Sequence, residues 1–206
     1  MLKQIQLLFI LLLSSICAAQ VHGEKEFQEC EVVFKDSTSF VGFCKIKKNN
    51  QILFTMDRDS TPDTWDATMV KSVRLYRSYQ DQVLEYWKIN KKRKPKLLEI
   101  LIYGDVMLYV RTTKRRVKDP KKTIVEGTDY HKDYKYKDAV IGYYLKRKNT
   151  DELVPIKLSW SDKNWKRKMI AYFKDCPLLV EDIKDDAYDK KSIRQLVEDY
   201  NVYCTE

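Results

Sequence analysis

The spacing of apolar residues changes once along the chain, near Ser161, and this change constrains the fold more than any other feature. Between Phe27 and about Lys157, apolar residues recur at every second position or in short runs, which is typical of β-strands. From Ser161 onward they recur at helical spacing. Strands first and helices last predict an α+β fold. We expect an antiparallel β-rich N-terminal part, a roll or an open barrel, followed by two or three C-terminal helices packed on the sheet.

Nine segments of the first part have strand periodicity and are bounded by turn-forming residues. They are residues 27–35, 39–47, 51–56, 69–76, 83–89, 97–103, 106–112, 140–146 and 153–158. Gly104–Asp105 stands between two runs rich in Leu, Ile, Val and Tyr, which predicts a two-residue hairpin turn. The chain therefore divides into a β-rich domain over 20–160 and a helical segment over 161–206.

The helical segment has three apolar stripes, which run from Trp165 to Phe173, from Leu178 to Ile183 and from Ile193 to Tyr200. Pro177 follows the first stripe and suits the first position of a new helix, because its missing N–H needs no partner there. We therefore expect a break between the first two helices at Cys176.

Residues 1–19 have the order of a cleavable signal peptide: a cation, an apolar run over 7–13, and then small residues. Cleavage before Gln20 fits best, and the run is too short to cross a membrane as a helix, which takes ~20 residues. Cys17 raises the alternative of a lipoprotein, although the bulky Ile16 before it disfavours lipidation. We expect an exported protein without a transmembrane helix in the mature chain: periplasmic, attached to the outer membrane, or secreted.

Four cysteines remain once the leader is removed, and an even number in an exported protein indicates disulfides. They are Cys30, Cys44, Cys176 and Cys204. Folding the first two predicted strands about Ser37 sets Cys30 opposite Cys44 on one face, which predicts a cross-strand bridge. Cys176 and Cys204 then pair by elimination, each near a helix end. A zinc site formed by the four lacks the usual close spacing of Cys or His.

The net charge of +9 is concentrated between Lys91 and Lys122, where twelve Lys and Arg accompany three acidic residues. Residues 113–136 match neither period, so we expect a long basic loop, and loops of that length often carry a function. The candidate polyanion-binding residues are Lys114, Arg115, Arg116, Lys118, Lys121 and Lys122. The alternative is that these cations are solvated ends of strands and prevent pairing at a sheet edge.

The sequence contains no HExxH, GxSxG, P-loop or GxGxxG motif, and we expect no metal and no cofactor. His131 lies among acidic residues at 129–133, a pattern that more often meets water than a metal. Asp63 and Asp66 flank Trp65, which could contact a sugar or simply form a polar turn with an aromatic anchor. Tyrosines and lysines also alternate around residue 135, a pattern that suits stacking on sugars or bases.

Several motifs between residues 95 and 204 resemble those of exported proteins of Bacteroidetes bacteria whose activity is unknown. They are the hairpin at Gly104–Asp105, YYLK at 143–146, YFKDCP at 172–177 and LVEDYN at 196–201. Cleavage directly before Gln20 is also similar to signal peptides of that group. The resemblance implies export and assigns no catalytic residue, and the basic insertion after Thr112 departs from it.

Three hypotheses about function follow. The first is a non-enzymatic binding or scaffold module of the cell envelope or of the secreted proteins. The second is a hydrolase that uses carboxylates to cleave an envelope or extracellular polymer. The third is a binder of polyanions or anionic surfaces through the basic region over 91–122. The expected partners are an envelope protein, a glycan or an anionic surface, with peripheral membrane contact left open and no nucleic acid.

Overall fold

The computed structural model describes residues 27–89, 94–118, 134–157 and 159–205 of the chain. They form two compact units, unit 1 up to Gln82 and unit 2 from Val83 onward. Antiparallel strands come first and three helices last, which confirms the α+β prediction. Among the described residues, no helix is long and apolar enough to cross a membrane.

The described part of unit 1 contains five strands, which pair antiparallel in the order β5-β1-β2-β3-β4 and do not close into a barrel. The strands are β1 (Gln28–Phe34), β2 (Ser39–Ile46), β3 (Ile52–Thr55), β4 (Asp63–Trp65) and β5 (Val70–Leu75). Alternate residues point to one face and form the core, among them Val32, Phe54 and Val73, which are fully or almost fully buried. Unit 1 is therefore stabilised by the packing of its own strands.

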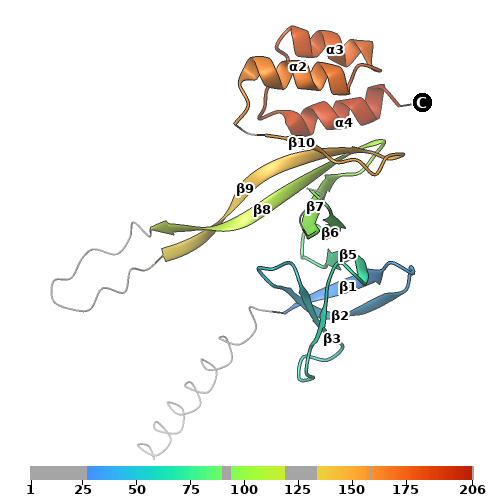
Figure 1. Ribbon diagram of the computed structural model, residues 1–206, viewed down its shortest axis with the longest axis vertical. Helices are drawn as coiled ribbons and strands as arrows, with labels where there is room; N and C mark the ends of the chain where they lie inside the picture. Colours follow the sequence, from blue (N-terminus) through green and yellow to red (C-terminus); the bar gives the residue numbers. More distant parts are fainter. Residues whose placement is uncertain (1–26, 90–93, 119–133, 158, 206) are drawn as a thin grey trace, which may run out of the picture. The chain divides into compact units, whose positions relative to one another are not determined.

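Unit 2 contains the other five strands and all three helices of the described chain. The strands are β6 (Gln82–Trp87), β7 (Lys96–Ile102), β8 (Val106–Lys118), β9 (Tyr134–Arg147) and β10 (Val154–Ile156). The helices are α2 (Asp162–Tyr172), α3 (Pro177–Lys184) and α4 (Ile193–Tyr203). The strands pair antiparallel in the order β6 to β10. The helices lie together on one side of β8, β9 and β10 (Figure 1).

Alternation along β8 and β9 gives unit 2 two apolar clusters. Leu108 and Leu145 are buried against the helices, in a core that includes Trp165. Tyr109 and Tyr144, each adjacent to one of these leucines in its strand, belong to a second cluster on the opposite face. The helices thus cover only one face of the strands, as the period change at Ser161 predicts.

The nine expected strands correspond to all strands but β4, which is short and polar and gives no periodic signal. The expected loop over 113–136 is wrong at both ends, because β8 continues to Lys118 and β9 begins at Tyr134. These strand ends carry no apolar alternation, so their period is invisible in the sequence. Residues 119–133 lie outside the described residues.

The predicted register of β1 and β2 is also wrong. Cys30 lies opposite Gly42, and Cys44 lies opposite Gln28, a shift of two residues from the expected pairing. The turn is centred on Asp36 rather than on Ser37, since the Asp36 carboxylate accepts hydrogen bonds from the backbone N–H and hydroxyl of Thr38. In the structure Cys30 and Cys44 are buried and unbridged, with a hydrogen bond between their side chains, so the bridge expected between them stays a prediction.

Candidate functional site: a basic ribbon and its anchor

The hairpin of β8 and β9 is much longer than the strands beside it (Figure 1). Pairing with β7 extends along β8 only to Val110, and pairing with β10 reaches β9 only at 143–145. Residues 112–118 and 134–140 pair with each other and with no other strand in the part of the chain that the structure describes. We call these two segments the basic ribbon.

A β-bulge marks the point where the ribbon leaves the sheet. Arg111 lies opposite Gly142, but Thr112 lies opposite Val140, so β9 has one extra residue there. Bulges increase the local twist and bend the strand that contains the extra residue. The bulge therefore separates a hairpin base packed in unit 2 from a two-stranded extension.

The ribbon contains six cationic residues and one carboxylate, Asp138. The cations are Lys114, Arg115, Arg116, Lys118, Lys135 and Lys137. The register sets Lys114 opposite Asp138, but it also sets Arg115 opposite Lys137, a cross-strand pair of like charge that is unfavourable in the absence of an anion. Four of the six predicted binding residues thus lie in β8, whereas Lys121 and Lys122 lie outside the described residues.

The base of the hairpin is fixed to α4 by one amide side chain. Asn201 accepts a hydrogen bond from the Val106 N–H (2.9 Å) and donates one to the Val106 carbonyl (2.8 Å), as a neighbouring strand would. Gly104 packs directly against this amide, and a Cβ atom at residue 104 would overlap it. The start of β8 is therefore held by the last helix.

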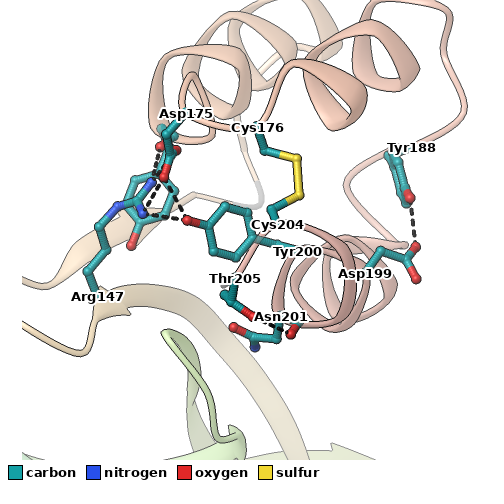
Figure 2. The surroundings of a disulfide bond; sticks show 10 residues. Arg147, Asp175, Cys176, Tyr188, Asp199, Tyr200, Asn201, Cys204 and Thr205 are labelled. Atoms are coloured by element: carbon teal, nitrogen blue, oxygen red, sulfur yellow. Dashed lines mark hydrogen bonds and ion pairs between the residues drawn. A yellow bond between two sulfur atoms is a disulfide. The ribbon is translucent and has the colours of Figure 1, made fainter.

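The end of β9 is fixed by an ionic network around Arg147, shown in Figure 2. The guanidinium donates to both carboxylate oxygens of Asp175 (2.9 and 2.7 Å), to the Tyr200 hydroxyl (2.8 Å) and to the Tyr172 carbonyl (2.7 Å). It also lies over the rings of Tyr172 and Tyr200, at 5.0 and 5.3 Å from their centroids. A bidentate pair of this kind holds a defined geometry, so it fixes β9 relative to α2 and α4.

The network sets the charge state of Asp175. Burial raises the pKa of Asp175, but hydrogen bonds from Arg147 and Tyr200 outweigh it, and the pKa lies below its ordinary value. The Tyr200 hydroxyl donates to Asp175 at 2.7 Å, which accounts for part of this effect. Asp175 is therefore a carboxylate at neutral pH and completes the ion pair with Arg147.

A disulfide reinforces the same place. Cys176 and Cys204 are bonded, with a Cα–Cα distance of 5.7 Å, and they join the N-cap of α3 to the C-cap of α4 (Figure 2). Cys176 follows Asp175 in the chain, so the covalent and ionic links meet at the root of the hairpin. The sequence predicted this cysteine pair by elimination. It did not predict the roles of Arg147 and Asn201, because their partners lie more than twenty residues away and no sequence pattern links them.

A second polar cluster lies on the face of unit 2 away from the helices. The carboxylate of Glu85 accepts hydrogen bonds from the Tyr109 hydroxyl (2.8 Å) and the Trp87 indole N–H (3.1 Å). Burial, together with the charge of Glu85, raises the pKa of Tyr109. The Lys146 ammonium lies 5.2 Å from the centre of the Trp87 ring. These contacts join β6 to β8 and β9, so we interpret the cluster as structural.

The remaining candidates from the sequence are the residues around Trp65 and His131. Trp65 packs on Phe34 and stacks on Phe54, and Asp66 accepts hydrogen bonds from the N–H and hydroxyl of Thr68. This arrangement is a polar turn with an aromatic anchor. His131 lies outside the described residues, and within the described ranges no group of three or more His, Cys, Asp or Glu could hold a metal ion.

The chain was also compared with known proteins. No family model, no curated protein and no solved structure matches it.

Proposed function

We propose that the protein is an exported, non-enzymatic binding module, and that the basic ribbon binds an anionic polymer or surface of the cell envelope. The observation that carries this proposal is the register of β8 and β9 beyond Arg111. It brings six cations and a single carboxylate onto a two-stranded segment that pairs with no other described strand.

Without a bound anion, the positive charge of the ribbon lowers the stability of the ribbon. An isolated two-stranded ribbon is marginal in water, and like charges across it lower its stability further. A polyanion would neutralise the cations and release counterions, so binding would stabilise the ribbon and would weaken steeply with salt. The same field would attract the ligand over roughly a Debye length, about 10 Å at moderate ionic strength.

The anchor supports this role mechanically. Asn201 and the Arg147 network hold the two strands at the end opposite the ribbon, and the Cys176–Cys204 disulfide joins the ends of α3 and α4 next to these contacts. An extension whose base is fixed loses less conformational freedom when it binds, which favours affinity. In this proposal the helices of unit 2 hold the base of the hairpin and do not bind the ligand themselves.

The proposal is tested by salt elution from immobilised heparin. The triple variant K114E/R115E/R116E should elute at clearly lower salt than the wild type, and its log–log salt dependence should fall by about one unit for each cation lost. The matched control is K163E/R167E/K168E, which makes the same charge change on the exposed face of α2. Equal elution of the two triple variants would show that net charge alone determines retention, and the ribbon proposal would then be wrong.

A further inference from the structure

We infer that the basic ribbon binds an anionic polysaccharide through one of its two faces, which we call the aromatic face. This inference rests on the proposed function and deepens it, because it names the ligand class and the residues that select it. The aromatic face comprises residues 114, 116 and 118 of β8 and residues 134, 136 and 138 of β9.

The register defines the two faces. Cross-strand partners share a face, and alternate positions of a strand fall on the same side. Lys114, Arg116 and Lys118 are the partners of Asp138, Tyr136 and Tyr134, so these six positions form one face. The other face, which we call the aliphatic face, comprises residues 113, 115, 117, 135, 137 and 139.

The two faces carry the same number of cations but different chemistry. Each has three: Lys114, Arg116 and Lys118 on the aromatic face, and Arg115, Lys135 and Lys137 on the aliphatic face. Both tyrosines and the single carboxylate of the ribbon belong to the aromatic face. Positive charge alone therefore does not distinguish the faces, whereas rings and a hydrogen-bond acceptor do.

This combination suits a charged sugar polymer. Cations pair with sulfate, phosphate or carboxylate substituents, and Arg does so with two parallel hydrogen bonds. A tyrosine ring offers a flat apolar surface, with an electron-rich face, on which the C–H side of a sugar ring can pack. The Asp138 carboxylate can accept hydrogen bonds from sugar hydroxyls. Residues 114 to 118 span ~14 Å along the strand, so the polymer would lie along the ribbon.

A polyanion without sugar rings would use only the cations. Inorganic polyphosphate and vesicles of phosphatidylglycerol and phosphatidylcholine offer dense negative charge, but no C–H face of a sugar ring. Their binding should therefore depend on the number of cations and should be indifferent to the tyrosines. This difference separates the polysaccharide from the two other sources of anionic groups.

The experiment compares two pairs of variants of the full chain by titration with heparin oligosaccharide, polyphosphate and the vesicles. Two triple variants each remove three cations from one face, so they have the same net charge. They are K114Q/R116Q/K118Q for the aromatic face and R115Q/K135Q/K137Q for the aliphatic face. Y134S/Y136S removes both rings, and Y134F/Y136F keeps them without the hydroxyls. Hydrogen exchange in the helices, which lie outside the ribbon, shows for each variant that unit 2 is folded.

For heparin, we expect the aromatic-face triple to weaken binding at least about fivefold more than the aliphatic-face triple. Y134S/Y136S should weaken heparin binding about tenfold, as loss of stacking does elsewhere, and should leave polyphosphate and vesicle binding unchanged. Y134F/Y136F should bind heparin within about twofold of the wild type, because the rings are retained.

Three results would count against the inference, and they differ in which part of the proposal they contradict. Equal losses from the two triples, with no effect of the tyrosines, would overturn the aromatic face but keep the ribbon as a binder of polyanions. Equal loss of vesicle and heparin binding in Y134S/Y136S would identify an anionic surface as the ligand and overturn the polysaccharide. Unchanged binding in both triples would overturn the proposed function itself.

Discussion

Units 1 and 2 each contain five antiparallel strands among the described residues, but they are stabilised in different ways. Unit 1 relies on the packing of its strands, and its two cysteines are buried thiols. Unit 2 adds three helices, a disulfide and the Arg147 network, which meet at the base of one hairpin. The disulfide and the Arg147 network therefore occur in the unit whose hairpin extends beyond its own sheet. This coincidence indicates that the links hold the base of the hairpin in place.

Removal of the disulfide should cause the largest difference in stability between the two units. C176S/C204S should lower the free energy of unfolding of unit 2 by about 3 kcal/mol, because the bridge restricts the unfolded chain between Cys176 and Cys204, which are 28 residues apart. Unit 1 should keep its stability. Peptide-resolved hydrogen exchange measures both units in one experiment.

Reductant provides the control for this prediction. It should reproduce the loss in unit 2 and leave unit 1 unchanged if Cys30 and Cys44 are unbridged, as they are in the structure. If reductant destabilised unit 1 as well, a second disulfide would be present there, and the contrast between the two units would fail.

The next effect concerns unit 1 alone. A Cβ atom at Gly42 would lie 2.5 Å from the Thr55 carbonyl oxygen and 2.8 Å from the Phe54 ring, and the backbone oxygen cannot move without disturbing β3. Gly42→Ala should therefore lower the stability of unit 1 by about 2 kcal/mol. Chemical denaturation, monitored by hydrogen exchange in β2 and β3, would measure this loss of stability.

Gly142→Ala in unit 2 is the matched control. The nearest atom to its new Cβ is the Ile156 carbonyl oxygen at 3.7 Å, an ordinary contact. The change in stability should stay within about 0.5 kcal/mol, as for substitutions without a specific clash. Equal destabilisation by the two substitutions would show that close packing over Gly42 does not stabilise unit 1.

These elements also show how far the sequence alone could predict the structure. The change of period at Ser161 predicted strands followed by helices, because burial against one face imposes a period that the residues display. The β1–β2 register was beyond such reasoning. A shift of two residues keeps every side chain on its face, so only the turn at Asp36 distinguishes the two pairings.

The candidate site was predictable in composition but not in geometry. The cluster of cations at 114–118 was visible in the sequence, whereas its place in β8 was not, because this part of the strand shows no apolar alternation. The contacts of Arg147 and Asn201 join segments far apart in the chain, and single-sequence periodicity contains no information about them.

The smallest expected effect is the pH dependence of the anchor. The pKa of Asp175 is lowered in the folded protein, so its contribution to stability is present above the unfolded pKa, about 4, and is lost as the pH falls through the folded value. The side chain is 46% exposed, so screening limits this contribution to less than about 1 kcal/mol. Asp175→Asn should be slightly less stable than the wild type at neutral pH.

Thermal unfolding of unit 2 at a series of pH values measures this difference. The wild type and D175N should converge as the pH falls from ~5 to ~2, because protonation removes the same charge that the substitution removes. A constant difference over that range would show that the Asp175 charge does not stabilise the hairpin base.

The most direct test of the central claim is a map of backbone amide shifts in the isotope-labelled protein during titration with heparin oligosaccharide. We predict that the shifts concentrate at 112–118 and 134–140, fade with added salt, and leave the helices and unit 1 at their free positions. Shifts confined to the helices or to unit 1, with residues 112–118 and 134–140 unchanged, would contradict the account.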